Sequence, residues 1–333
     1  MKCLVTGGAG FIGSHVAERL VSAGHEVLVL DDLSGGVEAN VPRGAVFIKG
    51  SVCAPEVDGL FQEFKPAWVF HLAAYAAEGL SHHIPVFNFR NNLEGTANVL
   101  AAAHRAGVKH FVFTSSIAVY GHGIGRSPFF EDTEAEPVDP YGIAKLACEQ
   151  HIKAAARYHR GPNWTIFRPH NVFGELQNIS DPYRNVVGIF ARCARLGQPM
   201  PIFGDGAQTR SFSYIDQVAA AIADAPTNLG AVNQIINIGG DEVLSVRELA
   251  RAVSEAMGVE EKLAFLLARA EVQAAHCDHA KARRIFSGMT GLSVAEGLKR
   301  MAAWVRSLPE IPPPTPCPSP IEIEDNLPPS WRT

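Results

Sequence analysis

A glycine cluster near the start of the chain constrains the fold more than any other feature. The stretch "TGGAGFIG", residues 6–13, contains Gly8-x-Gly10-x-x-Gly13 directly after an apolar run and directly before a segment with apolar residues at helical spacing. Strand, glycine turn and helix in this order are typical of a dinucleotide site, because glycines let the backbone approach a pyrophosphate that the helix N-terminus attracts. We therefore expect a dinucleotide to lie against this cluster.

Apolar runs and helix-like segments alternate along the first half of the chain. The later runs lie at residues 45–50, 67–74, 110–116 and 164–169, and the longest helix-like segments at residues 91–107 and 141–159. Runs that are apolar throughout, rather than at every second residue, are typical of parallel strands buried on both faces. We predict an α/β fold, a doubly wound parallel sheet of the Rossmann type, with residues 1–174 forming mainly the dinucleotide-binding domain.

The strict alternation ends at about residue 174. Residues 175–307 are expected to form mainly a smaller α/β substrate-binding region, some of whose elements could return to the main sheet. We expect longer loops around residues 188–200, and a single late strand and two helices at residues 234–240, 245–257 and 293–305. Prolines recur in residues 308–333, which predicts an extended tail that is either solvated or wrapped over a neighbouring surface.

Charge, hydropathy and cysteine spacing exclude several classes of function. A net charge of -5 gives no basic field for nucleic acid, and no apolar run reaches the roughly 18 residues needed to cross a membrane. We expect a cytoplasmic protein with reduced thiols, because the six cysteines are scattered and form no CxxC pair. No metal site is expected, because the adjacent His82 and His83 cannot easily face one ion and His276-x-x-His279 lacks a spaced second pair of ligands.

Two carboxylates stand where the second strand should end. Asp31 and Asp32 follow the glycine cluster by about twenty residues, where a carboxylate can accept hydrogen bonds from the adenosine ribose. That charge would repel a 2′-phosphate, and the next arginine along the chain is Arg43, so NAD is favoured over NADP. The alternative is that Asp31 only starts the turn "DDLSGG".

A tyrosine and a lysine share one helix face after a strand that ends in two serines. Tyr141 and Lys145 are one turn apart, and an ammonium about 4 Å from the phenol contributes up to about 4 kcal/mol at an effective dielectric of about 20. That would lower the phenol pKa by roughly three units before desolvation opposes it, towards the range useful for a general base. Ser115 or Ser116 could hold the reacting oxygen, whereas the alternative is an ordinary amphipathic pair.

With these features the chain resembles the extended short-chain dehydrogenase/reductase family, and within it the nucleotide-sugar 4-epimerases. The resemblance covers about residues 1–305 and rests on the stretches "TGGAGFIG", "DDLSGG", "HLAA", "NNLEGT", "SSIAVYG", "YGIAK", "RPHNVFG" and "TRSFSYIDQVA". It implies a UDP-glucose 4-epimerase-like activity on a nucleoside diphosphate sugar, with UDP the expected nucleotide. It also implies a homodimer formed through the helices that begin near Asn92 and Tyr141.

The resemblance assigns roles to individual residues. Tyr141 is the implied catalytic base, Lys145 binds the nicotinamide ribose, and Ser116 bonds the sugar's 4-hydroxyl. The implied NAD contacts, besides Tyr141 and Lys145, are Gly7, Gly10, Phe11, Ile12, Gly13, Asp31, Asp32, Leu72, Ala73, Ala74, Asn92, Ser115 and Arg168. The implied substrate contacts, besides Ser116, are Asn171, Arg210 and Arg269, the arginines gripping the diphosphate unless they form surface ion pairs.

The residues after the serine favour one reaction of this family. Related dehydratases and decarboxylases carry acidic residues there, whereas this chain has Ile117 and Ala118, which cannot move protons. We therefore expect epimerisation at carbon 4 through a transient 4-keto sugar. The alternatives are a 4-keto reductase, a different epimerase or a non-catalytic NAD-binding regulator.

Other positions bear on which sugar is bound. Either Ala275 or His276 corresponds to the site that gates N-acetylated sugars in the family, and Arg184 could meet a sugar acid. His170 could line the sugar site or be a hydrogen-bonded structural histidine. Ser51 stands where the family usually has an aspartate near the adenine.

Overall fold

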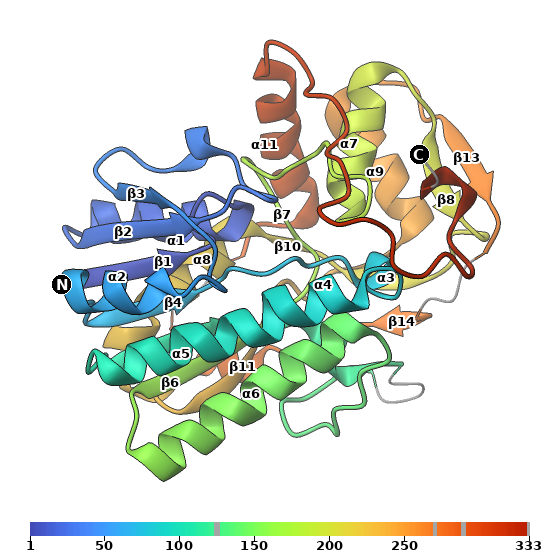
Figure 1. Cartoon of the computed structure of the whole chain (residues 1–333). Coiled ribbons are helices and arrows are strands. Elements are labelled where there is room, and N and C mark those ends of the chain that lie inside the picture. Colours follow the sequence, from blue (N-terminus) through green and yellow to red (C-terminus); the bar gives the residue numbers. More distant parts are fainter. Residues whose placement is uncertain (123–126, 269–271, 288–290, 332–333) are drawn as a thin grey trace.

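Seven parallel strands form the centre of the molecule (Figure 1). The computed structural model describes residues 1–122, 127–268, 272–287 and 291–331. The strand order is β11-β6-β5-β4-β1-β2-β3, so the sheet is doubly wound and its order reverses between β1 and β4. The strands are β1 Lys2–Thr6, β2 Glu26–Asp31, β3 Val46–Lys49, β4 Trp68–His71, β5 His110–Thr114, β6 Asn163–Pro169 and β11 Gln234–Ile238. The predicted fold class is confirmed, and such a reversal places the ligand crevice at the carboxyl ends of β1 and β4.

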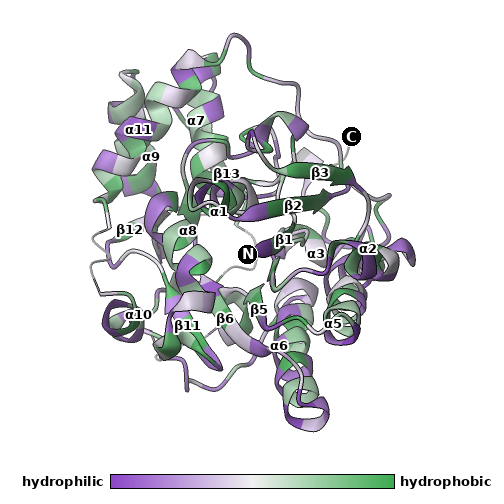
Figure 2. Ribbon diagram, turned by 90° about the vertical axis from the view of Figure 1, so that its left-hand side faces the viewer, coloured by the Kyte–Doolittle hydropathy of each residue, from purple (hydrophilic) through white to green (hydrophobic). Residues whose placement is uncertain are grey.

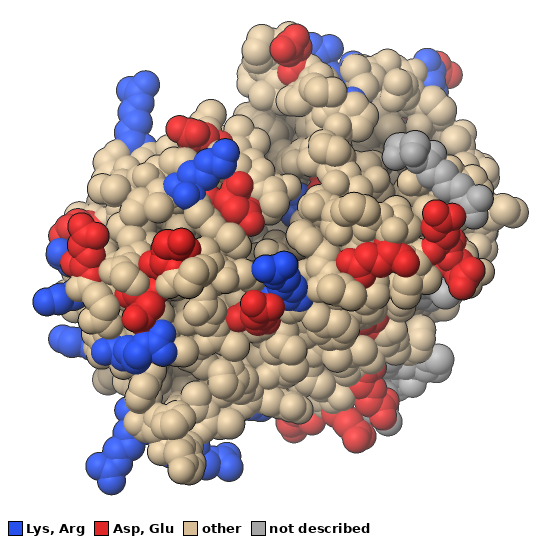
Figure 3. Space-filling model, viewed as in Figure 1, with Lys and Arg blue, Asp and Glu red and all other residues tan. Residues whose placement is uncertain are grey.

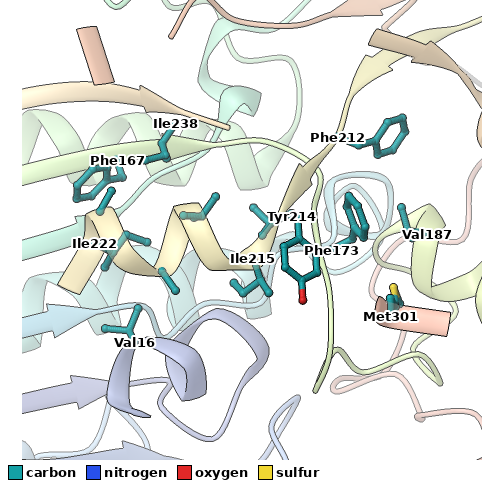
Figure 4. Packing of buried hydrophobic residues seen from close by; sticks show 14 of the residues in the cluster. Val16, Phe167, Phe173, Val187, Phe212, Tyr214, Ile215, Ile222, Ile238 and Met301 are labelled. Atoms are coloured by element: carbon teal, nitrogen blue, oxygen red, sulfur yellow. The ribbon is translucent and has the colours of Figure 1, made fainter. Parts of the chain in front are cut away.

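Helices cover both faces of the sheet. Side chains of β1 alternate between the faces, so Cys3 and Val5 belong to one buried cluster and Leu4 to another. Helices α1 Phe11–Ser22 and α8 Ile215–Asp224 cover the first face, and α2 Glu56–Phe64, α5 Gly95–Arg105 and α6 Pro140–His159 cover the second. Figure 2 shows the hydrophobic strands between these layers, and Figure 4 shows Val16 of α1 and Ile222 of α8 within the first cluster.

The region after residue 174 is more regular than the sequence suggested. The loops expected at residues 188–200 are instead occupied mostly by helix α7, Val186–Leu196, and this prediction was wrong. Val187, Phe190, Ala191 and Ala194 recur at helical spacing and are buried, which explains the helix. The late strand β11 and helix α8 return to the main sheet, as the sequence allowed.

Short strands and three further helices complete this region. The two predicted late helices are α9 Val246–Met257 and α11 Val294–Ser307, each with a serine-glutamate capping box, and a shorter helix, α10 Ala280–Ile285, lies between them in the sequence. Besides β11, short strands in the described part of the chain form three small sheets, and the first of these strands lies just before residue 174. They are β7 Val172–Phe173, β8 Met200–Phe203, β9 Thr209–Ser211, β10 Ser213–Tyr214, β12 Val243–Ser245, β13 Leu263–Leu266 and β14 Ala274–Ala275.

The proline-rich tail lies against its own chain (Figure 1, red). Over residues 308–331 it is extended and irregular apart from a 3₁₀ turn at Pro329–Trp331. Leu327 and Trp331 are buried, so of the two alternatives for the tail the structure has the one in which it packs on a protein surface. The six cysteines are free. Among the described residues, no helix has both the length and the apolar character required to cross a membrane.

Buried histidines make the fold sensitive to acid. Burial lowers the pKa of His71 to about 3, of His110 to about 4 and of His170 to about 3. Their unfolded pKa is about 6.5, so stability is full above that pH and is lost as the pH falls towards the folded values. We expect each histidine to destabilise the fold by roughly 1 kcal/mol at pH 5.5 relative to pH 7.5. Urea unfolding at the two pH values checks this, and an unchanged or higher midpoint at pH 5.5 would contradict it.

Candidate active site

A cavity of about 700 Å³ opens at the carboxyl ends of the main strands. Its wall extends from the glycine cluster after β1 to residues of the second region, so both parts of the chain contribute to it. The outer surface on one side mixes acidic and basic side chains rather than presenting a basic patch (Figure 3). The residues of the described chain include no group of three or more histidine, cysteine, aspartate or glutamate side chains placed to hold a metal.

Most of the residues singled out in the sequence lie on this wall. They are Gly7, Gly10, Phe11, Ile12, Gly13, Asp31, Asp32, Leu72, Ala73, Ala74, Ser115, Ser116, Tyr141, Lys145, Asn171 and Arg210. Asn92 and Arg168 lie behind the wall, and Arg269 is outside the described residues. The structure thus brings together groups that are up to about 200 residues apart in the sequence.

Two glycines allow the chain to pack tightly under the cavity. Gly7 has φ +72°, and a Cβ there would lie 2.6 Å from the backbone nitrogen of Ala73 in the segment after β4. A Cβ on Gly13 would lie 2.0 Å from the carbonyl oxygen of Gly7. Any larger residue would therefore displace the turn from β1 or the start of α1. The backbone of residues 7–13 thus forms a shelf at the start of α1, here called the glycine shelf, that fits a pyrophosphate.

Asp31 has two roles at the end of β2. Its carboxylate accepts hydrogen bonds from the backbone nitrogens of Ala9, at 3.0 Å, and Leu33, at 2.8 Å, so it orders the glycine turn. Burial raises its pKa, and these hydrogen bonds oppose the rise. Asp31 also lines the cavity, so its turn-forming role does not remove it from the ribose position.

Arg184, from a distant loop, lies beside the turn that follows Asp31. A Cβ on Gly35 would lie 2.9 Å from Nη2 of Arg184, although the sequence showed no arginine near Asp31 before Arg43. Arg184 is ion-paired with Asp181, with Nε and Oδ2 2.6 Å apart, and lies over the ring of Tyr75 at 4.9 Å. The Arg184 guanidinium is thus already held by the Asp181 carboxylate and by the ring of Tyr75.

Tyr141 lies in the first turn of α6, opposite the end of β5. Asp139 caps this helix by accepting a hydrogen bond from the backbone nitrogen of Gly142 at 2.9 Å. Burial raises the pKa of the Tyr141 phenol, and the hydrogen bond with Ser116 acts in the opposite direction. The sequence argument anticipated a lowered pKa, and in the structure the desolvation of the phenol is the larger effect.

Lys145, one helical turn after Tyr141, is hydrogen-bonded to the end of β5. Its Nζ donates a hydrogen bond to the carbonyl oxygen of Thr114 at 2.7 Å and lies 5.8 Å from the centre of the Tyr141 ring. Burial lowers the pKa of Lys145 to about 8. The ammonium is thus hydrogen-bonded to the end of β5, and desolvation remains the larger effect on the pKa of the phenol.

A buried ion pair supports the Tyr141 helix from behind. Arg168 donates from Nε and Nη2 to Glu149 at 2.9 and 2.6 Å, and Ser115 donates to the same carboxylate at 2.6 Å. The Arg168 side chain is 4% exposed and lies behind the cavity wall in this ion pair, and its contact with NAD stays a prediction. Glu149 was missed, although its spacing of four residues after Lys145 indicated the same helix face.

This ion pair provides a stability prediction. Glu149→Gln or Arg168→Met should lower the free energy of unfolding by about 3–5 kcal/mol, because each leaves an unpaired buried charge or a broken network. The matched control is Arg105→Met, which breaks the exposed pair with Asp58 and should cost about 1 kcal/mol or less. Urea unfolding of the three variants measures the difference, and equal costs for buried and exposed pairs would refute it.

Asn92 lies behind the cavity wall and fixes the backbone of Tyr75, which lines the cavity. Its side-chain amide accepts from the backbone nitrogen of Tyr75 at 2.8 Å and donates to the Tyr75 carbonyl at 3.2 Å. Asn92 thus supports the segment after β4, its neighbour Asn91 lines the cavity, and the contact of Asn92 with NAD stays a prediction. The same amide nitrogen also donates to Oδ1 of Asn88 at 3.1 Å, so both ends of the Asn92 amide are hydrogen-bonded.

The second part of the wall carries the expected substrate contacts. Asn171 donates to the carbonyl of Ser211 at 3.0 Å, and Arg210 lies on the adjacent strand β9. Ala275 lines the cavity, whereas His276 contacts Ser127, so of the two candidates for the gating position Ala275 is on the wall. Ser51 accepts a hydrogen bond from the backbone nitrogen of Cys53 at 3.2 Å.

Two further side chains bear on the chemistry. His170 lines the cavity, but its ring nitrogens face His279 at 2.8 Å and the Ser211 carbonyl at 3.2 Å, as for a hydrogen-bonded structural histidine. Glu78 also lines the cavity, and its charge acts to raise the pKa of Tyr141. Glu78 was not among the residues predicted from the sequence, because none of the motifs includes it.

Comparisons with known proteins agree with this geometry. The model of the "NAD dependent epimerase/dehydratase family" matches residues 3–239. A UDP-glucose 4-epimerase of Mycolicibacterium smegmatis is 34% identical over 316 residues, covering 92% of this chain and 99% of that protein.

Solved structures give the same result. The UDP-glucose 4-epimerase of Thermotoga maritima with UDP-glucose has a TM-score of 0.88 and 33% identity, covering 92% of this chain and 99% of that one. The Thermus thermophilus UDP-glucose 4-epimerase complex with NAD has a TM-score of 0.85 and 33% identity, with the same coverage. Similar proteins also include a UDP-N-acetyl-alpha-D-glucosaminuronate decarboxylase and a dTDP-glucose 4,6-dehydratase.

Proposed function

This chain belongs to the NAD-dependent epimerase/dehydratase family, whose cofactor is NAD, and we propose that it inverts carbon 4 of a nucleoside diphosphate sugar. The observation that carries the proposal is the set Ser116, Tyr141 and Lys145 on one wall of the cavity, with Ile117 and Ala118 beside it. The set can remove and return the proton of a hydroxyl. The two apolar residues give no acid or base at the positions that dehydration or decarboxylation would use.

Some residues of the cavity would hold the dinucleotide, and Tyr141 would transfer the proton of the sugar hydroxyl. NAD, when bound, supplies a positively charged nicotinamide that accepts a hydride from carbon 4 and returns it. The glycine shelf and Asp31 hold the dinucleotide, and Lys145 binds its nicotinamide ribose. Tyr141 takes the proton of the 4-hydroxyl and later gives it back, while Ser116 orients the same oxygen. If the 4-keto sugar turned so that its other face met the nicotinamide, return of the hydride would give the epimer.

Burial of Tyr141 fits this role only with positive charge nearby. Because burial raises the pKa of the phenol, it would remain protonated near neutral pH unless cations stabilise the phenolate. Arg184 acts to lower this pKa, and Lys145 lies 5.8 Å from the ring. We infer that the phenol becomes a base only when the cavity holds its cationic cofactor.

Glu78 supports a second candidate reaction. Decarboxylases and dehydratases occur among the similar proteins, and both reactions need an additional proton donor or acceptor at the cavity. Glu78 is a carboxylate on the wall whose charge reaches Tyr141. We rank these reactions below epimerisation, because Glu78 is not at the position after Ser116 where the family carries its acid.

A panel of substrates tests the proposal. Purified protein is incubated separately with UDP-glucose, UDP-N-acetylglucosamine and UDP-glucuronate without added NAD, and the sugar protons are followed by NMR. We expect the galacto epimer in at least one tube, and Ala275 leaves room for the N-acetyl group. Loss of water or carbon dioxide would favour the second candidate, and no conversion by NAD-containing protein would favour a regulator or another nucleotide sugar.

The homodimer and the cytoplasmic location stay predictions.

A further inference from the structure

The proline-rich tail crosses two cavity-lining segments that are distant in the sequence. The first segment comprises residues 75–87 after β4, and the second comprises residues 175–185 before α7. In the first, the carbonyl of His83 accepts from the backbone nitrogens of Glu322 and Ile323 at 2.8 and 3.2 Å. In the second, the carbonyl of Ser180 accepts from the backbone nitrogen of Thr315 at 2.8 Å. The tail therefore links the two segments through backbone hydrogen bonds.

Side chains strengthen both links. The Glu322 carboxylate accepts from the backbone nitrogens of Val86 and Phe87 at 2.7 and 3.0 Å, at the start of the short helix α4, Pro85–Phe89. The carbonyl of Pro312 accepts from the Ser180 hydroxyl at 2.9 Å and from Arg192 at 2.6 Å. A solvated tail would make none of these contacts.

Trp331, near the end of the tail, packs against both segments. It is 7% exposed and belongs to a buried cluster with Leu80 and Ile84 of the first segment. Its ring meets the edge of Tyr183 in the second segment, with centroids 5.2 Å apart, and lies 6.1 Å from His83. Trp331 also lines the cavity, so the end of the tail is part of its wall.

This part of the wall lies at the reacting end. Ser81 of the first segment accepts from the backbone nitrogen of Tyr141 at 3.3 Å. In the second segment, Arg184 is next to Tyr183 in the sequence, and its charge acts on the Tyr141 pKa. Both segments that Trp331 joins thus border Tyr141, and the second also extends towards the glycine turn, where the Leu176 carbonyl accepts from Asn40 at 3.3 Å.

We propose that Trp331 contacts the sugar of the bound nucleotide sugar, and that the tail holds the two segments that form the rest of the sugar pocket. The proposal rests on the proposed function, because it assigns the sugar to the Tyr141 end. An indole face is suited to the C–H surface of a sugar ring and to exclusion of water from it.

Binding measurements with the full chain test this proposal. Calorimetry compares UDP-glucose, which carries the sugar, with UDP, which lacks it. Trp331→Ala should weaken UDP-glucose about tenfold, leave UDP within about twofold, and raise KM more than it lowers kcat. Trp331→Phe should restore most of the affinity. The control is Trp304→Phe on α11, which should change neither ligand.

A second pair of variants leaves Trp331 in place. Glu322→Gln weakens the link to α4 and should lower UDP-glucose affinity in the same direction, whereas Glu324→Gln, on an exposed neighbouring residue, should not. Unchanged UDP-glucose binding in Trp331→Ala, or equal losses for UDP and UDP-glucose, would overturn the proposal while the proposed function stands. If the unmodified protein binds neither ligand, UDP as the nucleotide of the proposed function fails, and this proposal, stated for UDP-glucose, fails with it.

Discussion

Tyr141→Phe is expected to lower kcat for 4-epimerisation by about 10²- to 10⁴-fold, the usual contribution of a positioned general acid-base group. The phenylalanine ring keeps the buried contacts of the tyrosine and removes only the hydroxyl that moves the proton. NAD bound to the purified protein should therefore be unchanged, and stability should change by about 1 kcal/mol or less. Progress curves with the sugar that is converted, and NAD content after denaturation, give the two readings.

The control for this variant is Tyr158→Phe on the same helix. Tyr158 is 85% exposed and far from the cavity wall, so losing its hydroxyl should leave kcat unchanged. Undiminished activity in Tyr141→Phe would remove Tyr141 from the chemistry. A loss of NAD together with activity would instead mean that the tyrosine holds the cofactor and that its role as a base is unproven.

Gly13→Ala is expected to remove most of the bound NAD. The added methyl group would lie 2.0 Å from the Gly7 carbonyl oxygen and 2.7 Å from its carbonyl carbon, so the backbone under the pyrophosphate must move. Both clashes are with backbone, which cannot swing aside as a side chain can. We expect NAD content to fall at least about tenfold and unfolding to become easier by several kcal/mol, as for overpacked buried sites.

Gly59→Ala on α2 is the matched control for this substitution. A Cβ at Gly59 meets nothing within 4 Å, and alanine is the better helix former, so this change should stabilise the protein by about 0.5–1 kcal/mol. Spectrophotometric NAD content and urea unfolding of both variants give the comparison. Full NAD content in Gly13→Ala would show that the dinucleotide does not lie on this turn.

Local patterns were enough to predict the main sheet and the glycine shelf. The apolar runs and the Gly8-x-Gly10-x-x-Gly13 stretch depend on neighbours in the sequence, and the structure has the strands and the turn where they were expected. Tyr141 and Lys145 lie on one helix face for the same reason. Helix α7 also carries a local pattern in Val187, Phe190, Ala191 and Ala194, and it was missed by giving too much weight to the end of the alternation.

Features that depend on distant contacts could not be predicted in this way. The position of Arg184 beside Gly35 and the buried Arg168 and Glu149 pair join segments that no short-range pattern connects. The pKa of Tyr141 depends on how deeply α6 is buried, which the spacing of Tyr141 and Lys145 does not reveal. Proline recurrence indicated an extended tail, but extension alone does not say what the tail contacts.

Deuterium incorporation tests the central claim most directly. Purified protein without added NAD converts the accepted UDP-sugar in D₂O, and NMR and mass spectrometry locate deuterium in the product. Inversion by hydride removal and return to the same carbon predicts the 4-epimer with hydrogen still on carbon 4 and no deuterium on any carbon. Deuterium on carbon 4 or carbon 5, or a product that has lost water or carbon dioxide, would contradict the account.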